Sequence, residues 1–150
     1  MKTFSHLTPQ GEASMVDVSA KPVSLREAVA RGEIRLAKAT LRLIERHEIA
    51  KGNVLATARL AGILAAKRTG GLIPLCHPLP LSHCEVNFEI AKSGDRIVIT
   101  ASAKVAAQTG VEMEALTAVT VAALTIYDMC KAVDKTMCLT DIKLVSKTKR

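Results

Sequence analysis

The stretch from residue 84 to residue 106, CEVNFEIAKSGDRIVITASAKVA, decides the fold. Over residues 84–90 apolar and polar side chains alternate, as in a strand that buries one face. Lys-Ser-Gly-Asp at 92–95 is typical of a turn, and the alternation resumes over residues 96–106. The stretch therefore predicts a β-hairpin whose two strands turn their apolar side chains to the same side.

The elements predicted on either side of this hairpin identify the fold class. They are a helix over 24–32 that opens with the capping box Ser-Leu-Arg-Glu, a strand over 34–37, helices over 40–50 and 53–68, a helix over 109–133 that opens with Thr-Gly-Val-Glu, and a strand over 139–146. From residue 34 onward this is the β-α-β-β-α-β order of ferredoxin-like folds, with an extra helix in the first crossover. We expect one α+β domain over residues 1–150, with a flexible N-terminal arm at 1–14. Its helices cover one face of an antiparallel sheet, and a partner covers part of the other.

Composition narrows the class of partner. Lys and Arg number 21 against 14 Asp and Glu, and this surplus of +7 favours an anionic partner. Aromatic residues make up 2%, which disfavours a protein that stacks nucleic-acid bases, and no basic amphipathic anchor suggests a membrane surface. Because no secretory signal opens the chain and no Cys-x-x-Cys pair occurs, we expect a cytoplasmic protein with reduced thiols.

Lys51 is a candidate phosphate-binding residue. It comes just before Asn53, a good N-cap for the helix that follows. Free N–H groups and the helix dipole favour anions at such a position, and an ammonium beside them helps to hold a phosphate. The alternative is an ordinary solvated lysine in a loop.

A second candidate segment contains closely spaced cysteines and histidines. Cys76-His77 and His83-Cys84 would together supply four zinc ligands, but their spacing departs from that of common structural zinc sites. We therefore expect no metal. His77 is the stronger candidate for chemistry because it lies in the proline-bracketed sequence Ile-Pro-Leu-Cys-His-Pro at 73–78. The alternative is a loop histidine bonded to the backbone.

The long apolar helix predicted after the hairpin carries charges near both ends. Asp128 and Lys131 are three residues apart and share a face with Glu114. Glu114 and Asp128 are 14 residues apart, or roughly 21 Å along a straight helix, so they cannot both touch one small reacting centre. If both ends serve one pocket, a second subunit must supply one of them.

Six short segments share one resemblance. They are MVDVS at 15–19, KGNV at 51–54, ARLAG at 58–62, LIPLCHP at 72–78, TGVEMEAL at 109–116 and YDMCKAV at 127–133. Together they closely resemble the MoaC family, the cyclic pyranopterin monophosphate synthases of molybdenum cofactor biosynthesis. The order and separations of the segments match as well as their letters, so the resemblance covers nearly the whole chain.

The resemblance implies a substrate and an assembly. The substrate is 3′,8-cyclo-7,8-dihydroguanosine 5′-triphosphate, made from GTP by a radical SAM enzyme, and the products are cyclic pyranopterin monophosphate and diphosphate. The implied assembly is a homohexamer, a trimer of dimers, with each active site between subunits. The sequence requires no cofactor and leaves open whether Mg²⁺ accompanies the triphosphate.

The resemblance also assigns residues. The catalytic pair it implies is Asp128 and Lys131, and Lys51 matches the family's lysine before the helix. The substrate-binding residues it implies are Leu75, Cys76, His77, Glu112, Met113 and Glu114. We expect Lys51 and His77 to be catalytic as well, with His77 assisting near neutral pH. We expect Asp128 and Lys131 to act as an acid–base pair, with the pKa of Lys131 lowered in a cationic, partly desolvated pocket. The alternative function is a basic RNA-binding module without catalysis. That module needs aromatic side chains on its central strands, and the hairpin places Phe88 on its apolar face instead.

Overall fold

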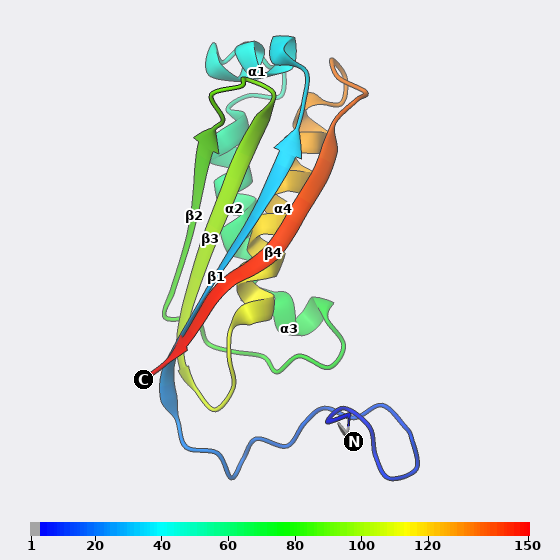
Figure 1. Ribbon diagram of the computed structural model, residues 1–150, viewed down its shortest axis with the longest axis vertical. Helices are drawn as coiled ribbons and strands as arrows, with labels where there is room; N and C mark the ends of the chain where they lie inside the picture. The colour runs from blue at the N-terminus through cyan, green and yellow to red at the C-terminus, as the bar shows by residue number, and fades with distance from the viewer. Residues whose placement is uncertain (1–3) are drawn as a thin grey trace.

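The computed structural model describes residues 4–150, whose strands form an antiparallel sheet of order β2-β3-β1-β4 (Figure 1). The elements are β1 (Ser24–Arg35), α1 (Lys38–Glu45), α2 (Val54–Lys67), α3 (Thr69–Leu72), β2 (His83–Ile90), β3 (Arg96–Ala107), α4 (Glu112–Cys130) and β4 (Cys138–Lys149). Helices α2 and α4 lie on one face of the sheet. The predicted hairpin is β2–β3, and the predicted α+β ferredoxin-like class is confirmed.

The helix predicted over 24–32 is wrong, because these residues form most of the central strand β1. Ala28 and Ala30 point into the core and are at most 1% exposed. Ala30 pairs with Ala101 of β3 on one side and with Leu144 of β4 on the other. A helix cap contributes only about 1 kcal/mol, so ladders on both edges and burial of alternate side chains outweigh it.

Other predicted boundaries shift by a few residues. The strand expected at 34–37 is the end of β1, and the helix expected at 40–50 is the shorter α1. Asn53 does cap α2, since its side-chain oxygen accepts a hydrogen bond from the Ala56 N–H at 3.1 Å. The capping box expected at 109–112 does not form, because Val111 is the N-cap of α4 and no side chain caps it.

Small residues let the two long helices pack closely. A Cβ atom added to Gly62 of α2 would lie 2.9 Å from the Ala118 carbonyl oxygen and 3.3 Å from the Ala122 Cβ of α4. Ala118 and Ala122 of α4 are fully buried.

Among the described helices, α4 is long and apolar enough to cross a membrane, but half of its apolar stretch is buried as in a core helix.

The face of the sheet opposite the helices carries charged side chains among small and apolar ones. Glu33, on β1, is 6% exposed and accepts hydrogen bonds from Arg31 at 3.1 Å and Arg96 at 3.3 Å. Phe88 belongs to the helix-covered side, where the Arg59 guanidinium lies 5.5 Å from the centre of its ring. The strand aromatic is therefore not exposed to nucleic-acid bases on the open face.

The segment before β1 runs beneath the end of the sheet where α4 begins (Figure 1). Leu7 and Ala13 pair across a small turn, and Thr8 accepts a backbone hydrogen bond from Gly11 at 2.9 Å. Of the arm predicted at 1–14, residues 1–3 lie outside the described part of the chain. The predicted flexibility of the rest stays a prediction.

Replacing Gly62 tests the close packing of α2 on α4. Gly62→Val places a branched side chain against the Ala118 carbonyl, so we expect the free energy of unfolding to fall by about 1–3 kcal/mol. Gly71→Val is the matched control, because a Cβ at Gly71 meets no atom within 4 Å. Urea denaturation followed by circular dichroism measures both, and equal stability of the two variants would contradict the packing argument.

Candidate functional site

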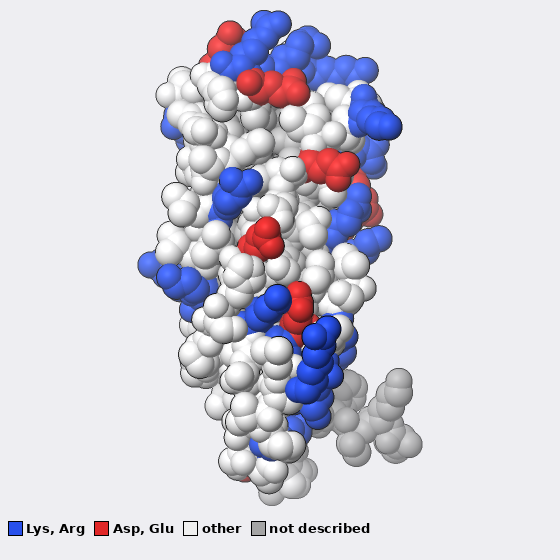
Figure 2. Space-filling model, turned by 90° about the vertical axis from the view of Figure 1, so that its left-hand side faces the viewer, with Lys and Arg blue, Asp and Glu red and all other residues white. Residues whose placement is uncertain are grey.

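The residues assigned from the sequence form two groups at opposite ends of α4. Lys51, Asp128 and Lys131 meet at its C-terminal end, beside α1, where Lys and Arg side chains gather on the surface in Figure 2. The six predicted substrate-binding residues surround a cavity at its N-terminal end. This division is the one that the length of the helix predicted.

At the C-terminal end, one carboxylate joins two ammonium groups. The Lys51 Nζ donates to Asp128 Oδ2 and to the Asp128 backbone oxygen, each at 3.0 Å. The Lys131 Nζ lies 2.9 Å from Asp128 Oδ1. The three side chains are about half exposed, so the group is open to a ligand or to a partner chain. Lys51 comes from the loop before α2, so the group joins segments that are distant in the sequence.

The protonation states of this group follow from its charges. The side chain of Lys131, and then that of Lys51, hold the pKa of the Asp128 carboxyl below its ordinary value. Asp128 in turn raises the pKa of Lys131. The expectation of a lowered Lys131 pKa is therefore wrong for the single protomer. Because Lys131 stays protonated, it is suited to donate a proton or to bind an anion rather than to act as a base.

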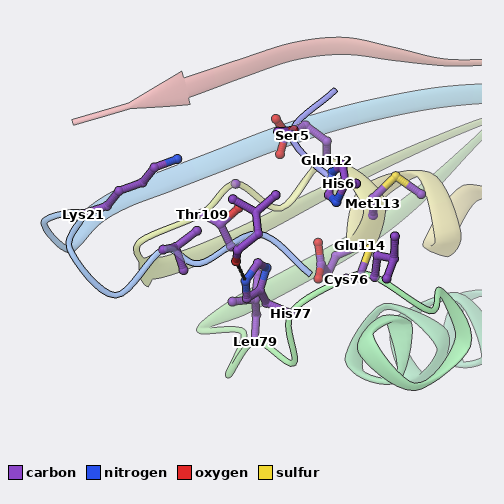
Figure 3. A pocket seen from close by; sticks show the side chains of 14 residues that line it. Ser5, His6, Lys21, Cys76, His77, Leu79, Thr109, Glu112, Met113 and Glu114 are labelled. Atoms are coloured by element: carbon purple, nitrogen blue, oxygen red, sulfur yellow. Dashed lines mark hydrogen bonds between the residues drawn. The ribbon is translucent and has the colours of Figure 1, made fainter. Parts of the chain in front are cut away.

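At the N-terminal end of α4, the chain forms an open cavity of about 440 Å³ (Figure 3). Leu75, Cys76 and His77 enter it from the proline-bracketed loop, which stays irregular as predicted. The first turn of α4 supplies the other three predicted residues, which are Glu112, Met113 and Glu114. The structure thus brings together all six.

The two carboxyl groups of this cavity have different environments. Burial raises the pKa of Glu114, which is 3% exposed, and the negative charge of Glu112 adds to the rise. Burial alone would also raise the pKa of Glu112, but its own backbone amide and Lys147 hold it below its ordinary value. Neighbouring carboxyls with pKa values moved apart are suited to serve as proton donor and acceptor.

Glu114 also influences the cysteine of the cavity. Burial, and then the nearby Glu114 carboxylate, raise the pKa of the Cys76 thiol. A thiol with a raised pKa is a poor nucleophile at neutral pH, since the thiolate is the reactive form. Cys76 is therefore suited to contact a ligand rather than to attack it.

Lys147 is a residue of this end that the sequence analysis did not single out. Its Nζ lies 3.0 Å from Glu112 Oε1, because the register of β4 places it opposite Ala28 on the helix-covered side. A smaller cavity of about 280 Å³, with Arg26, Lys147 and Lys149 in its lining, adjoins the first at Gly110 and Glu112. Only the register of β4, together with the alternation of its side chains between the two faces of the sheet, could have indicated that Lys147 lies beside Glu112.

The N-terminal segment also contributes residues that sequence reasoning did not assign. Ser5, His6, Val16, Val18 and Lys21 line the larger cavity. The sequence did contain a signal that this segment contributes to the site, because residues 15–19 belong to the segments that carry the family resemblance. What the motif could not show is that the segment lies against the proline-bracketed loop.

The zinc alternative finds no support in the geometry. Within residues 4–150, no three side chains of His, Cys, Asp or Glu gather as metal ligands. His77 bonds to a backbone oxygen of the N-terminal segment, and His83 lies on the edge strand β2, 3.9 Å from Glu85. All four cysteines are free thiols.

Asp134 holds the loop that follows Lys131. Its Oδ2 accepts hydrogen bonds from the Ala37 N–H at 2.9 Å and the Thr40 hydroxyl at 2.8 Å, at the start of α1. Its Oδ1 accepts two more from Thr136. Asp134 is 5% exposed, so it ties α1 to the C-terminal end of α4. Asp-Lys-Thr at 134–136 is an Asx-turn sequence that could have indicated the local bonds.

A ferredoxin-like α+β domain with a Lys–Asp–Lys group at one end and a carboxyl-lined cavity at the other has clustered ionisable side chains of the kind found in enzymes. The chain belongs to the MoaC family, whose model matches residues 15–150. The resemblance found in the six sequence segments is therefore confirmed.

Curated relatives cover nearly all of this chain. The cyclic pyranopterin monophosphate synthase of Chloroflexus aggregans is 59% identical over 96% of this chain and 87% of its own length. The synthase of Heliobacterium modesticaldum is 55% identical over 99% of this chain and 93% of its own length. That of Parvibaculum lavamentivorans is 54% identical, with 98% and 92% covered.

Asp134 gives the protein a measurable sensitivity to acid. Although burial acts to raise it, the hydrogen bonds from Ala37, Thr136 and Thr40 lower the pKa of Asp134 from 3.8 to about 2. A pKa lowered by folding stabilises the folded state by about 2 kcal/mol above pH 4, and this contribution is lost as the pH falls from about 4 to about 2.

Asp134→Asn should therefore lower the free energy of unfolding by about 2 kcal/mol at pH 7, and the difference from wild type should shrink towards pH 2. Urea unfolding at a series of pH values measures both curves. A constant difference across this pH range would show that the carboxylate charge is not the cause.

Proposed function

We propose that this chain is a cyclic pyranopterin monophosphate synthase of molybdenum cofactor biosynthesis. It converts 3′,8-cyclo-7,8-dihydroguanosine 5′-triphosphate into cyclic pyranopterin monophosphate and releases diphosphate, which makes it a phosphorus–oxygen lyase. The observation that carries the proposal is the 54–59% identity to named synthases over nearly the whole chain. The Lys51–Asp128–Lys131 group and the cavity supply the side chains that we propose for this chemistry.

The reaction opens one ring, builds another and closes a cyclic phosphate, so protons move at each stage. In the proposed site, ionised Asp128 keeps Lys131 protonated, and Lys131 donates a proton or neutralises charge that develops on the substrate. Lys51 and the N-terminus of α2 hold phosphate oxygens as diphosphate departs. His77 and Glu114 act on the base-derived part of the substrate in the cavity.

The two ends of α4 form one active site only across subunits. We therefore propose a homohexamer, a trimer of dimers, in which the cavity of one protomer meets the Lys–Asp–Lys group of its partner. Exposed apolar side chains on the helix layer support an assembly, since Leu60, Leu64 and Leu124 are 45–64% exposed on α2 and α4.

The proposed reaction uses no resident cofactor. Any Mg²⁺ arrives with the triphosphate, and turnover in the presence and absence of a chelator tests this. We also propose a cytoplasmic location, supported by four free thiols.

Replacing the shared carboxylate tests the acid–base assignment. Asp128→Asn removes the charge that both lysines contact, so kcat should fall on the order of 10²–10⁴-fold. Glu48→Gln is the matched control, because this exposed carboxylate, three residues before Lys51 in the sequence, has no side-chain partner among the described residues. The assay supplies the cyclised nucleotide and detects diphosphate and the cyclic phosphate. Wild-type turnover by Asp128→Asn would refute the role.

Mixing two inactive variants tests the shared site. Lys131→Ala disables one end of α4 and His77→Ala the other, so neither variant alone should turn over substrate. After dissociation and reassembly of an equal mixture, about a quarter of the wild-type rate should return, since random pairing restores one site in each mixed dimer. No recovery, with mixed oligomers verified by mass spectrometry, would place each active site within a single protomer.

A further inference from the structure

Helix α3 packs against the backbone that carries His77 and limits its movement. A Cβ added to Gly70 would lie 2.8 Å from Pro78 Cα and 3.2 Å from the His77 carbonyl oxygen, so α3 packs directly against this peptide. The proline that follows His77 also restricts His77 itself to extended backbone conformations. The imidazole therefore projects from a rigid platform rather than from a loose loop.

The imidazole ring is fixed from the other side by the N-terminal segment. His77 Nε2 lies 2.7 Å from the backbone carbonyl oxygen of Val16, the contact drawn as a dashed line in Figure 3. A carbonyl oxygen can only accept a hydrogen bond, so Nε2 carries the proton in the neutral ring. Among residues 4–150, Nδ1 has no hydrogen-bond partner, and its lone pair is left for a ligand of the cavity.

The segment that supplies this carbonyl is itself held in shape. The Asp17 carboxylate accepts hydrogen bonds from the Ser19 N–H at 2.9 Å and the Ser19 hydroxyl at 2.6 Å. The Lys21 N–H then donates to the Val18 carbonyl at 2.9 Å. These bonds set the direction of the chain immediately after Val16. The side chain of Asp17 is exposed, so it can be changed without opening the core.

We propose that residues 15–19 form part of the catalytic machinery as a positioning segment. The Val16 carbonyl holds His77 as the Nε2–H tautomer, which makes Nδ1 the atom that accepts a proton or hydrogen bond from the substrate. Asp17 is a positioning residue, because it fixes the turn that aims this carbonyl. The tautomer assignment stands on the structure alone, whereas its effect on turnover rests on the proposed synthase activity.

Nitrogen-15 NMR of the full-length protein tests the tautomer without any turnover. In ¹⁵N-histidine-labelled protein at a pH where imidazole is neutral, His77 should show a protonated Nε2 and an unprotonated Nδ1. The His77→Gln variant assigns its signals among the four histidines of the chain. A protonated Nδ1, or an even mixture of tautomers, would overturn the proposal.

Asp17→Ala tests the positioning role, with Glu12→Ala as the matched control. Both remove one exposed carboxylate from the part of the chain before β1, but the Glu12 side chain has no hydrogen-bond or ion-pair partner among the described residues. Asp17→Ala should shift His77 towards a tautomer mixture and lower kcat on the order of ten-fold with KM little changed, whereas Glu12→Ala should alter neither. An unchanged tautomer and kcat in Asp17→Ala would refute the role. If the wild type fails to turn over the cyclised nucleotide, the proposed function fails, while the NMR result still decides the tautomer.

Discussion

The close packing of α4 against β1 is the constraint on which the rest of the molecule depends. A Cβ added to Gly32 at this contact would lie 2.7 Å from Val119 Cγ1 of α4 and 2.9 Å from Ile142 Cγ1 of β4. Alanines on the buried side of α4 likewise have small side chains, which let the helix pack closely against the sheet and α2. Because cores of this density tolerate little displacement, the direction and position of α4 are fixed along its whole length. Its two ends are thereby fixed as well.

These two ends place part of the candidate site, while Lys51 and His77 come from loops that meet them. Glu112, Met113 and Glu114 belong to the first turn of α4, so their position follows from the packing of the helix. Asp128 lies in the last turn, and the Asp134 network fixes the loop beyond it against α1. Rigid elements hold catalytic groups more precisely than loops do, and here one helix serves both groups.

The sequence revealed local patterns well and long-range contacts poorly. The β2–β3 hairpin, the Asn53 cap and the apolar α4 follow from periodicity within short windows. Strand β1 was missed because its ladders join segments far apart in the chain, and its Ser-Leu-Arg-Glu start matches a helix cap. The separation of the candidate residues into two groups was predicted from the length of the helix alone. The contact between the Val16 carbonyl and His77 could not be predicted, because a backbone oxygen has no sequence signature.

Charge explains why the two ends of α4 complement each other. At the C-terminal end, two ammonium groups share one carboxylate, so the group keeps one positive charge for an anionic ligand. At the N-terminal end, Lys147 neutralises Glu112, and burial favours the uncharged form of Glu114. A single protomer thus separates the cationic group from the sparsely charged cavity by the length of a helix. A ligand with a phosphate chain and an uncharged ring needs both environments side by side, and the proposed contact between two copies of the chain would provide that arrangement.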